Sequence, residues 1–112
     1  MKAEKTFENK LKAYLKKRGA YFVKYFGCAY SQAGVPDILA CVNGTFVGIE
    51  VKASTGKPST LQLINLRDID ANGGIALLAY PEDYENIKLL ISALIDRTPV
   101  SALYEPFRWR FM

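Results

Sequence analysis

The dipeptide Asn43-Gly44 constrains the fold of this chain more than any other feature. It separates two runs rich in apolar and β-branched residues, at 36–42 and 45–53. A type I′ turn needs positive φ at both central residues, which Asn and Gly tolerate better than other residues. The pattern therefore predicts an antiparallel hairpin with a two-residue loop.

The predicted register places two carboxylates directly opposite each other. Asp37 pairs with Glu50, with Cβ atoms about 4.5–5.5 Å apart, and Lys52 lies two residues further along the same face. Like charges in such a pair are destabilising unless something neutralises them, and a divalent cation would do so. The opposite face carries apolar side chains and therefore predicts the core. These are Ile38, Ala40, Val42, Val47, Ile49 and Val51.

The flanking segments alternate between helical and extended patterns. We expect helices over 3–18, 59–72 and 82–96, further strands over 20–26 and 75–80, a loop over 27–35, and no clear period over 98–112. The order α-β-β-β-α-β-α predicts an α/β fold, with a mixed four-stranded sheet, a central antiparallel hairpin and flanking helices. A length of 112 residues predicts one domain spanning 1–112.

The chain contains no His, which excludes His-based general bases, Ser-His-Asp and Cys-His nucleophile systems, and His-liganded metals. Cys28 and Cys41 form no CxxC motif, so we expect small buried residues in a reducing compartment. No apolar run approaches the length of a membrane span, and the N-terminus has no signal-peptide pattern. We therefore expect a cytoplasmic protein, with no membrane partner and no small-molecule cofactor.

Positive charge is concentrated near the N-terminus. Residues 1–27 carry eight Lys or Arg and two Glu, whereas the net charge of the whole chain is +4. A local basic surface suits the phosphate backbone of a nucleic acid. Lys16 and Lys17 are therefore candidate DNA contacts.

Asp37 and Glu50 offer oxygen ligands with no His or Cys expected beside them, which favours a hard cation. Mg²⁺ is the expected ion, and Mn²⁺ is expected to substitute for it. Such an ion beside Lys52 suits phosphodiester hydrolysis, because the metal and the ammonium group can stabilise transition-state charge and activate a water molecule. The alternative is an ordinary salt bridge in which Lys52 joins two acids at the end of a sheet.

The segments around these residues resemble a known nuclease signature. Gly34-Val35-Pro36-Asp37 is followed, after twelve residues, by Glu50-Val51-Lys52, which is similar to the PD-(D/E)XK motif. The wider pattern resembles the VRR-NUC group, in particular its small stand-alone viral type. That pattern comprises Glu8 eleven residues before Gly19, Lys24 in the next strand, and Lys57-Pro58-Ser59-x-x-Gln62.

The resemblance implies a restriction-endonuclease-like core and a metal-dependent endonuclease that acts on branched or structured DNA, such as a Holliday junction or a fork. It implies that Asp37, Glu50 and the Val51 backbone carbonyl bind the metal, and that Lys52 serves the attacking water. It also implies a site role for Gln62 and for a first-helix acid, Glu8, which is an additional candidate ligand.

Two of these residues have a structural alternative. Ser59-x-x-Gln62 is also a capping box, and capping is expected to compete with a site-facing role for the Gln62 side chain. Glu8 also matches an i,i+4 ion pair with Lys12. Glu4, one turn earlier on the same stripe, is the alternative site acid.

Three further residues complete the candidate DNA contacts. Lys24 is expected beside the site if its strand borders the hairpin, although a solvated strand lysine fits the pattern nearly as well. Ser31 lies in a loop where members of the resembled family hold the DNA backbone. Lys57 follows the second strand of the hairpin.

The C-terminal stretch from Phe107 to Phe111 mixes aromatic and basic residues, which suits base stacking, phosphate contacts, a place in the core or a subunit interface. We favour the interface and expect a homodimer, because small nucleases of this type commonly act as symmetric pairs. Two other functions stay open. One is a non-cleaving nucleic-acid-binding module of the same fold, and the other is a viral protein-interaction factor that binds through the aromatic C-terminus.

Overall fold

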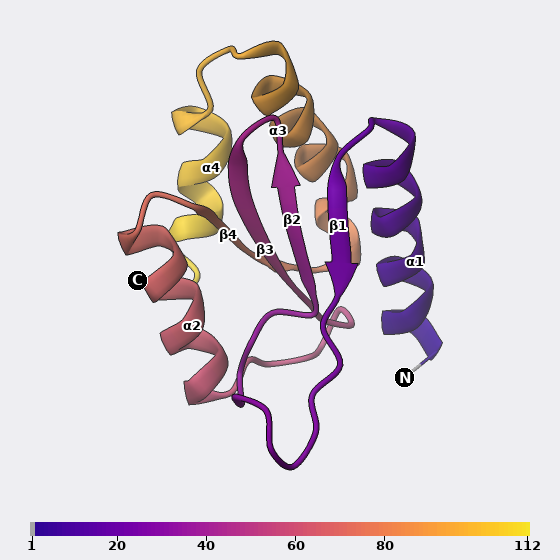
Figure 1. Ribbon diagram of the computed structural model, residues 1–112, viewed down its shortest axis with the longest axis vertical. Helices are drawn as coiled ribbons and strands as arrows, with labels where there is room; N and C mark the ends of the chain where they lie inside the picture. The colour runs from indigo at the N-terminus through magenta and orange to yellow at the C-terminus, as the bar shows by residue number, and fades with distance from the viewer. Residues whose placement is uncertain (1) are drawn as a thin grey trace.

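The computed structural model describes residues 2–112, which form a four-stranded sheet with the strand order β1-β2-β3-β4 (Figure 1). β1 and β2 are antiparallel, β2 and β3 are antiparallel, and β4 is parallel to β3. The elements in chain order are α1 (Lys2–Lys17), β1 (Tyr21–Lys24), β2 (Ile38–Val42), β3 (Thr45–Val51), α2 (Thr60–Ala71), β4 (Ile75–Ala79), the 3-10 turn η1 (Pro81–Asp83), α3 (Tyr84–Asp96) and α4 (Ser101–Arg108). The mixed sheet and the predicted element order are confirmed.

The hairpin has the predicted turn and register. Asn43 and Gly44 adopt φ values of 49° and 89°, as a type I′ turn requires. Val42 pairs with Thr45 at the turn, and the ladder continues to the last pair, Ile38 with Ile49. One further step along the same register brings Asp37 opposite Glu50.

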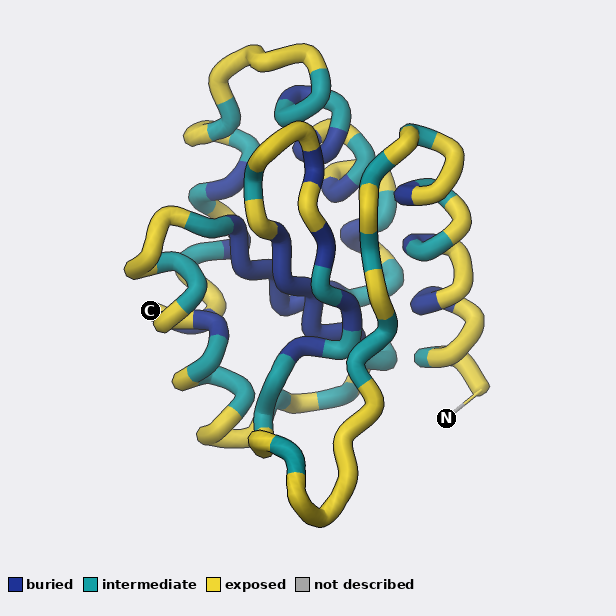
Figure 2. Tube along the Cα trace, in the orientation of Figure 1, coloured by how far each residue is buried: buried dark blue, intermediate teal, exposed yellow. Residues whose placement is uncertain are grey.

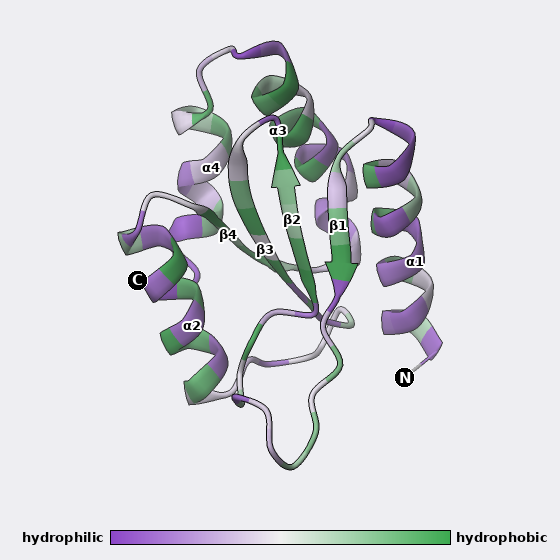
Figure 3. Cartoon of the chain, viewed as in Figure 1, coloured by the Kyte–Doolittle hydropathy of each residue, from purple (hydrophilic) through white to green (hydrophobic). Residues whose placement is uncertain are grey.

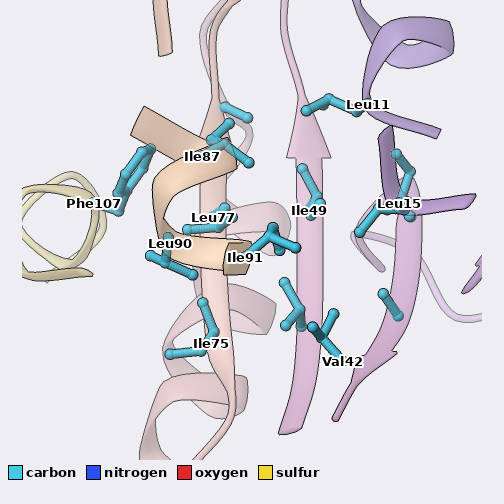
Figure 4. Close-up of a cluster of buried hydrophobic side chains, with 14 of the residues drawn as sticks. Leu11, Leu15, Val42, Ile49, Ile75, Leu77, Ile87, Leu90, Ile91 and Phe107 are labelled. Carbon is cyan, nitrogen blue, oxygen red and sulfur yellow. The ribbon is translucent and has the colours of Figure 1, made fainter. Parts of the chain in front are cut away.

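The main core lies between the sheet and three helices. The predicted apolar face of the hairpin is fully buried there, together with one side of β4 and apolar residues from α1, α3 and α4 (Figure 4). Figure 3 shows the corresponding contrast between the hydrophobic central strands and the hydrophilic outer surface of α1. The other side of the sheet carries a smaller cluster, in which α2 covers β4. Its buried members are Leu66, Ala76, Leu78 and Phe111.

α2 covers only part of its side of the sheet. The outer side chains of Tyr21, Val23 and Phe46 are 70%, 42% and 44% exposed, and Cys41, the register partner of Tyr21 and Phe46, is exposed between them. We call these four residues the open sheet face. Along β1 and β2, the tube in Figure 2 alternates between exposed and more buried positions.

Two local predictions were wrong. The first strand ends at Lys24 rather than continuing to residue 26. Both cysteines are free and exposed, because Cys28 lies in a loop and Cys41 points away from the main core.

The C-terminal stretch forms the helix α4 rather than an irregular segment, and its aromatic and basic residues mostly contact their own chain. Phe107 and Phe111 are buried. Arg108 pairs with Asp70 at 2.9 Å, and Arg110 pairs with Asp83 at 2.6 Å. The predicted interface stripe is therefore wrong for these four C-terminal residues, because packing and ion pairs already occupy them. Within residues 2–112, no helix is both long and apolar enough to cross a membrane.

Candidate active site

Asp37, Glu50 and Lys52 meet at one end of the sheet, where β2 begins and β3 ends. The hairpin register brings the two acids together, and the two-residue period of the extended chain puts Lys52 on the same side as Glu50. Lys52 Nζ lies 3.8 Å from Glu50 Oε2. This is the predicted arrangement of the three side chains. Twelve residues separate Asp37 from Glu50 in the sequence, and the hairpin brings them together.

Glu50 is held in an unusual state for a carboxylate. Its residue is only 3% exposed, and Oε1 is buried without a hydrogen-bond partner among the described residues. Burial, followed by the negative charge of Asp37, raises the Glu50 pKa to about 8, and the nearby Lys52 only partly opposes this. A buried acid with an unpartnered oxygen is ready to bind a cation, because a cation would stabilise the ionised form.

Asp37 is fixed from two sides. Its Oδ2 accepts a hydrogen bond of 2.8 Å from the Val51 backbone N–H, and its Oδ1 lies 3.4 Å from Lys24 Nζ. Its backbone carbonyl accepts a 2.8 Å bond from the Tyr25 N–H. These contacts hold the side chain at the start of β2, beside Glu50 and 25% exposed.

Glu8 is buried beside this pair and is bonded to lysines. Lys24 Nζ donates to Glu8 Oε1 at 2.8 Å, and Lys12 Nζ lies 3.1 Å from Oε2. Burial raises the Glu8 pKa, but hydrogen bonds from Lys24 and Lys12 and the charges of both outweigh it, so the pKa lies below its ordinary value. The predicted pairing with Lys12 and the predicted proximity to the site are therefore both present. Glu4 lies near enough for its charge to help raise the Glu50 pKa.

Gln62 both caps α2 and faces the site, two roles that were expected to compete for its side chain. Its Oε1 accepts a hydrogen bond of 2.9 Å from the Ser59 N–H, and Ser59 Oγ accepts one from the Gln62 N–H, which completes the capping box of α2. Its Nε2 donates to Glu50 Oε2 at 3.2 Å. The expected competition does not occur, because the two ends of one amide serve the two partners.

The remaining candidate DNA contacts are spread over the surface. Lys57 is exposed in the loop before α2, and Ser31 exchanges hydrogen bonds with the Cys28 backbone at 2.6 and 2.9 Å. Lys16 and Lys17 are exposed in the last turn of α1, about two turns beyond Glu8, so the structure does not bring them to the acids.

The loop between β1 and β2 adds a feature that the sequence analysis missed. A hollow of about 420 Å³ lies against its inner side and reaches Asp37. Phe26, which is 76% exposed, places its ring 5.9 Å from the same Lys24 ammonium group that contacts Asp37. Phe26 follows Lys24 by two residues, which could have indicated that the ring lies near the Lys24 ammonium group. The predicted strand ran to residue 26, so Phe26 was assigned to the sheet instead.

The donor set fits a hard divalent cation only in part. Two carboxylates offer oxygen ligands, and the unpartnered Glu50 Oε1 is the observation that favours a cation. Within residues 2–112 no group of three His, Cys, Asp or Glu side chains gathers closely enough to hold a metal. Both Glu8 oxygens lie close to lysine ammonium groups, Oε1 to that of Lys24 and Oε2 to that of Lys12.

Comparison with known proteins points in the same direction as this geometry. A sequence profile described as archaeal Holliday junction resolvase (hjc) matches residues 2–101. No curated protein matches the chain significantly.

The solved structures that match include one similar in fold and sequence. It is Hjc from Archaeoglobus fulgidus, described as a Holliday junction resolvase from an archaeal hyperthermophile. The two chains share 28% identity with a TM-score of 0.53, and the match covers 68% of this chain and 66% of the other. This chain therefore spans just under two thirds of the length of that relative.

Proposed function

Since the chain belongs to the archaeal Holliday junction resolvase family, we propose that it is a metal-dependent endonuclease that hydrolyses phosphodiester bonds in branched DNA. The observation that carries this proposal is the buried Glu50 with its unpartnered oxygen, opposite Asp37 and beside Lys52. A surface salt bridge would leave neither acid buried, so the ordinary salt-bridge alternative explains the site less well.

We propose that Asp37, Glu50 and the Val51 backbone carbonyl hold the cation, with Mg²⁺ as the ion and Mn²⁺ as a substitute. When bound, such an ion polarises a phosphate oxygen and lowers the pKa of a water molecule. Asp37 is prepared for this task because the Val51 N–H fixes one of its oxygens. Calorimetric titration with Mg²⁺ tests the assignment, since Glu50→Gln should abolish binding and Trp109→Ala should not.

The other residues act on the reacting groups or hold those that do. Lys52 is proposed to donate a hydrogen bond to the attacking water. It is also proposed to offset the negative charge on the phosphate oxygens in the transition state. Gln62 positions Glu50 through its 3.2 Å hydrogen bond. Glu8 is proposed to act through Lys24, which spans Glu8 and Asp37, rather than as a metal ligand.

The DNA contacts are proposed in two groups. Lys24 contacts Asp37 and suits the phosphates next to the cut, Ser31 lies on the adjoining loop, and Lys57 is exposed in the loop that leads into α2. Lys16 and Lys17 lie at the other end of α1 and suit a more distant part of a DNA arm. Phosphate contacts of this kind weaken steeply with salt, so each Lys→Ala variant should show a shallower dependence of affinity on salt.

We propose that the enzyme acts as a homodimer, and that the open sheet face is where the second copy binds. A four-way junction has two equivalent strands to cut, whereas the described part of one chain holds a single acid pair. An exposed apolar patch across three strands is also unusual for a monomer. Phe46→Glu should halve the mass measured by light scattering, because a C2 interface repeats the new charge on both partners.

The finer assignments made from the sequence stay predictions. The matched family neither supports nor excludes the VRR-NUC group or a viral origin. A cytoplasmic location is proposed because an enzyme that cuts DNA works where its substrate is.

A panel of DNA shapes tests the function. Labelled four-way junction, fork, single strand and plain duplex should be incubated in Mg²⁺, Mn²⁺ and EDTA with wild type and with Asp37→Asn. The proposal expects metal-dependent cutting of the four-way junction or the fork, and none by the variant. Tight binding to DNA without cutting would favour the non-cleaving binding module, and neither binding nor cutting would favour a protein partner.

A further inference from the structure

The loop between β1 and β2 extends from the end of the sheet where β2 begins and β3 ends (Figure 1), and two of its aromatic residues are exposed. Phe26 is 76% exposed and Tyr30 is 99% exposed. Large apolar rings in such positions bury little surface in the free protein, so the fold does not account for them. Figure 2 shows the same loop as the longest continuous exposed stretch at that end of the molecule.

Phe26 and two of the acids contact the same lysine. Lys24 Nζ lies 2.8 Å from Glu8 Oε1, 3.4 Å from Asp37 Oδ1 and 5.9 Å from the centre of the Phe26 ring. The ring therefore lies against the ammonium group that contacts a proposed metal ligand. Since its residue remains 76% exposed, most of the ring is free to contact another molecule.

The loop is held in shape by its own hydrogen bonds. The Tyr25 hydroxyl donates to the Gln32 carbonyl at 3.1 Å, and Ser31 closes the tip on Cys28. Gln32 and Asn65 connect the loop to α2 at 3.4 Å. A loop fixed in this way can present a ring to a ligand with little further loss of conformational entropy.

We propose that Phe26 is a specificity-determining residue that stacks on an unpaired nucleobase next to the phosphate to be cut, with Tyr30 as a second stacking surface at the loop tip. The inference rests on the proposed function for the source of that base, because branch points and single-stranded segments expose base faces and continuous duplex does not. Stacking on aromatic rings is a general means of holding unpaired bases. The hollow inside the loop, which reaches Asp37, gives the base room beside the acids.

Trp109 offers a matched control. It is also an exposed aromatic residue, at 74%, but it lies at the C-terminal end of α4 and donates its indole N–H to Glu105 at 3.0 Å. Trp109→Leu removes an exposed ring without touching the loop or the acids.

The test measures binding to oligonucleotides carrying the fluorescent base 2-aminopurine, in a Lys52→Ala background that prevents cutting. Probes are a four-way junction, a single strand and a plain duplex. Phe26→Leu should weaken binding to the first two roughly 5- to 150-fold, the range for losing one stacked base. It should also abolish the quenching of 2-aminopurine and leave duplex binding unchanged. Phe26→Trp should restore quenching, and Trp109→Leu should have no effect.

Equal affinity and quenching in Phe26→Leu and the parent protein would overturn the inference. A changed molecular mass in Phe26→Leu would instead assign the ring to a second copy of the chain and would also overturn it. The proposed function is judged separately, by whether the wild type cuts the junction. If Phe26→Leu cuts the junction as the wild type does and binds it equally well, the nuclease function stands and the stacking role is rejected. If Phe26 quenches 2-aminopurine but the wild type does not cut, the stacking role stands and the nuclease function is rejected.

Discussion

Gln62 donates a hydrogen bond of 3.2 Å from its side-chain amide to Glu50, while the same amide caps the helix that carries it. The start of α2 and the end of β3 are thereby joined at the acid pair. Formation of the helix cap and orientation of Glu50 depend on one side chain, so the site should be sensitive to how α2 begins.

Replacing Gln62 with Ala should reduce both stability and cleavage. Loss of the capping box should lower the free energy of unfolding by about 1 kcal/mol. Loss of the donor to Glu50 should lower the cleavage rate at saturating DNA roughly tenfold, by analogy with groups that orient metal ligands. Thermal unfolding and single-turnover cleavage measure the two effects.

Ser59→Ala provides the matched control because it removes the other half of the cap and leaves the Gln62 amide free to reach Glu50. It should lose similar stability, about 0.5–2 kcal/mol, with cleavage close to wild type. Equal losses of cleavage in both variants would mean that Gln62 acts only through the helix.

The buried Glu50 predicts an unusual dependence of stability on pH in metal-free protein. The Glu50 pKa is about 8 in the folded chain against an ordinary 4.5, so the folded state holds more protons than the unfolded state between these values. The free energy of unfolding should therefore fall as pH rises from about 5 to 8, by at most about 1.4 kcal/mol for each pH unit. The absence of His leaves few other groups that titrate in this range.

Chemical denaturation in EDTA across this pH range measures that slope. Glu50→Gln should remove most of it and should be the more stable protein at pH 8. Added Mg²⁺ should stabilise the wild type more at pH 8 than at pH 5, because binding requires the ionised carboxylate. A flat profile for the wild type would show that Glu50 is ionised without a metal.

Lys24 should matter for both stability and cleavage, because it holds Glu8 and Asp37 together. Lys24→Met leaves the buried Glu8 with one lysine fewer and should cost about 1–3 kcal/mol of unfolding free energy. The double variant Glu8→Gln with Lys24→Met should recover part of that loss, since no unpaired charge remains. Lys12→Met is the control, because Lys12 pairs with Glu8 and, within residues 2–112, makes no ion pair with Asp37. Cleavage should therefore fall more in Lys24→Met than in Lys12→Met.

Gly34 should tolerate no side chain. Its φ is +83°, and a Cβ atom there would lie 2.7 Å from the Leu61 carbonyl group. Gly34→Ala should lower the unfolding free energy by about 2–4 kcal/mol, from left-handed strain together with overpacking. Gly44→Ala should cost less, because φ is also positive, at +89°, but nothing lies within 4 Å. Equal losses of stability would show that the loop moves away from α2 at little cost.

Most of the fold and the centre of the site could be predicted because short-range signals determine them. Asn43-Gly44 sets the turn, the turn sets the register, and the register places Asp37 opposite Glu50. The core face of the hairpin follows from the same alternation. Each step depends on neighbours along the chain, which a single sequence displays.

The errors concern contacts between distant segments. α4 was missed because Pro106 interrupts its pattern, whereas the helix is stabilised by ion pairs such as Arg108 with Asp70. The exposure of Cys41 depends on how far α2 extends across the sheet, which no local pattern specifies. The double role of Gln62 likewise depends on the distance between α2 and β3.

The cleavage rate of a four-way junction by wild type and by Lys52→Ala, under single-turnover conditions with Mg²⁺, tests the central claim most directly. The account predicts metal-dependent cuts in two opposite strands by the wild type. It also predicts a loss of at least about a hundredfold in Lys52→Ala, the scale for a residue that stabilises transition-state charge, with the unfolding temperature and the affinity for the junction retained. Cutting at an equal rate by the two proteins would contradict the assignment of the reaction to Asp37, Glu50 and Lys52.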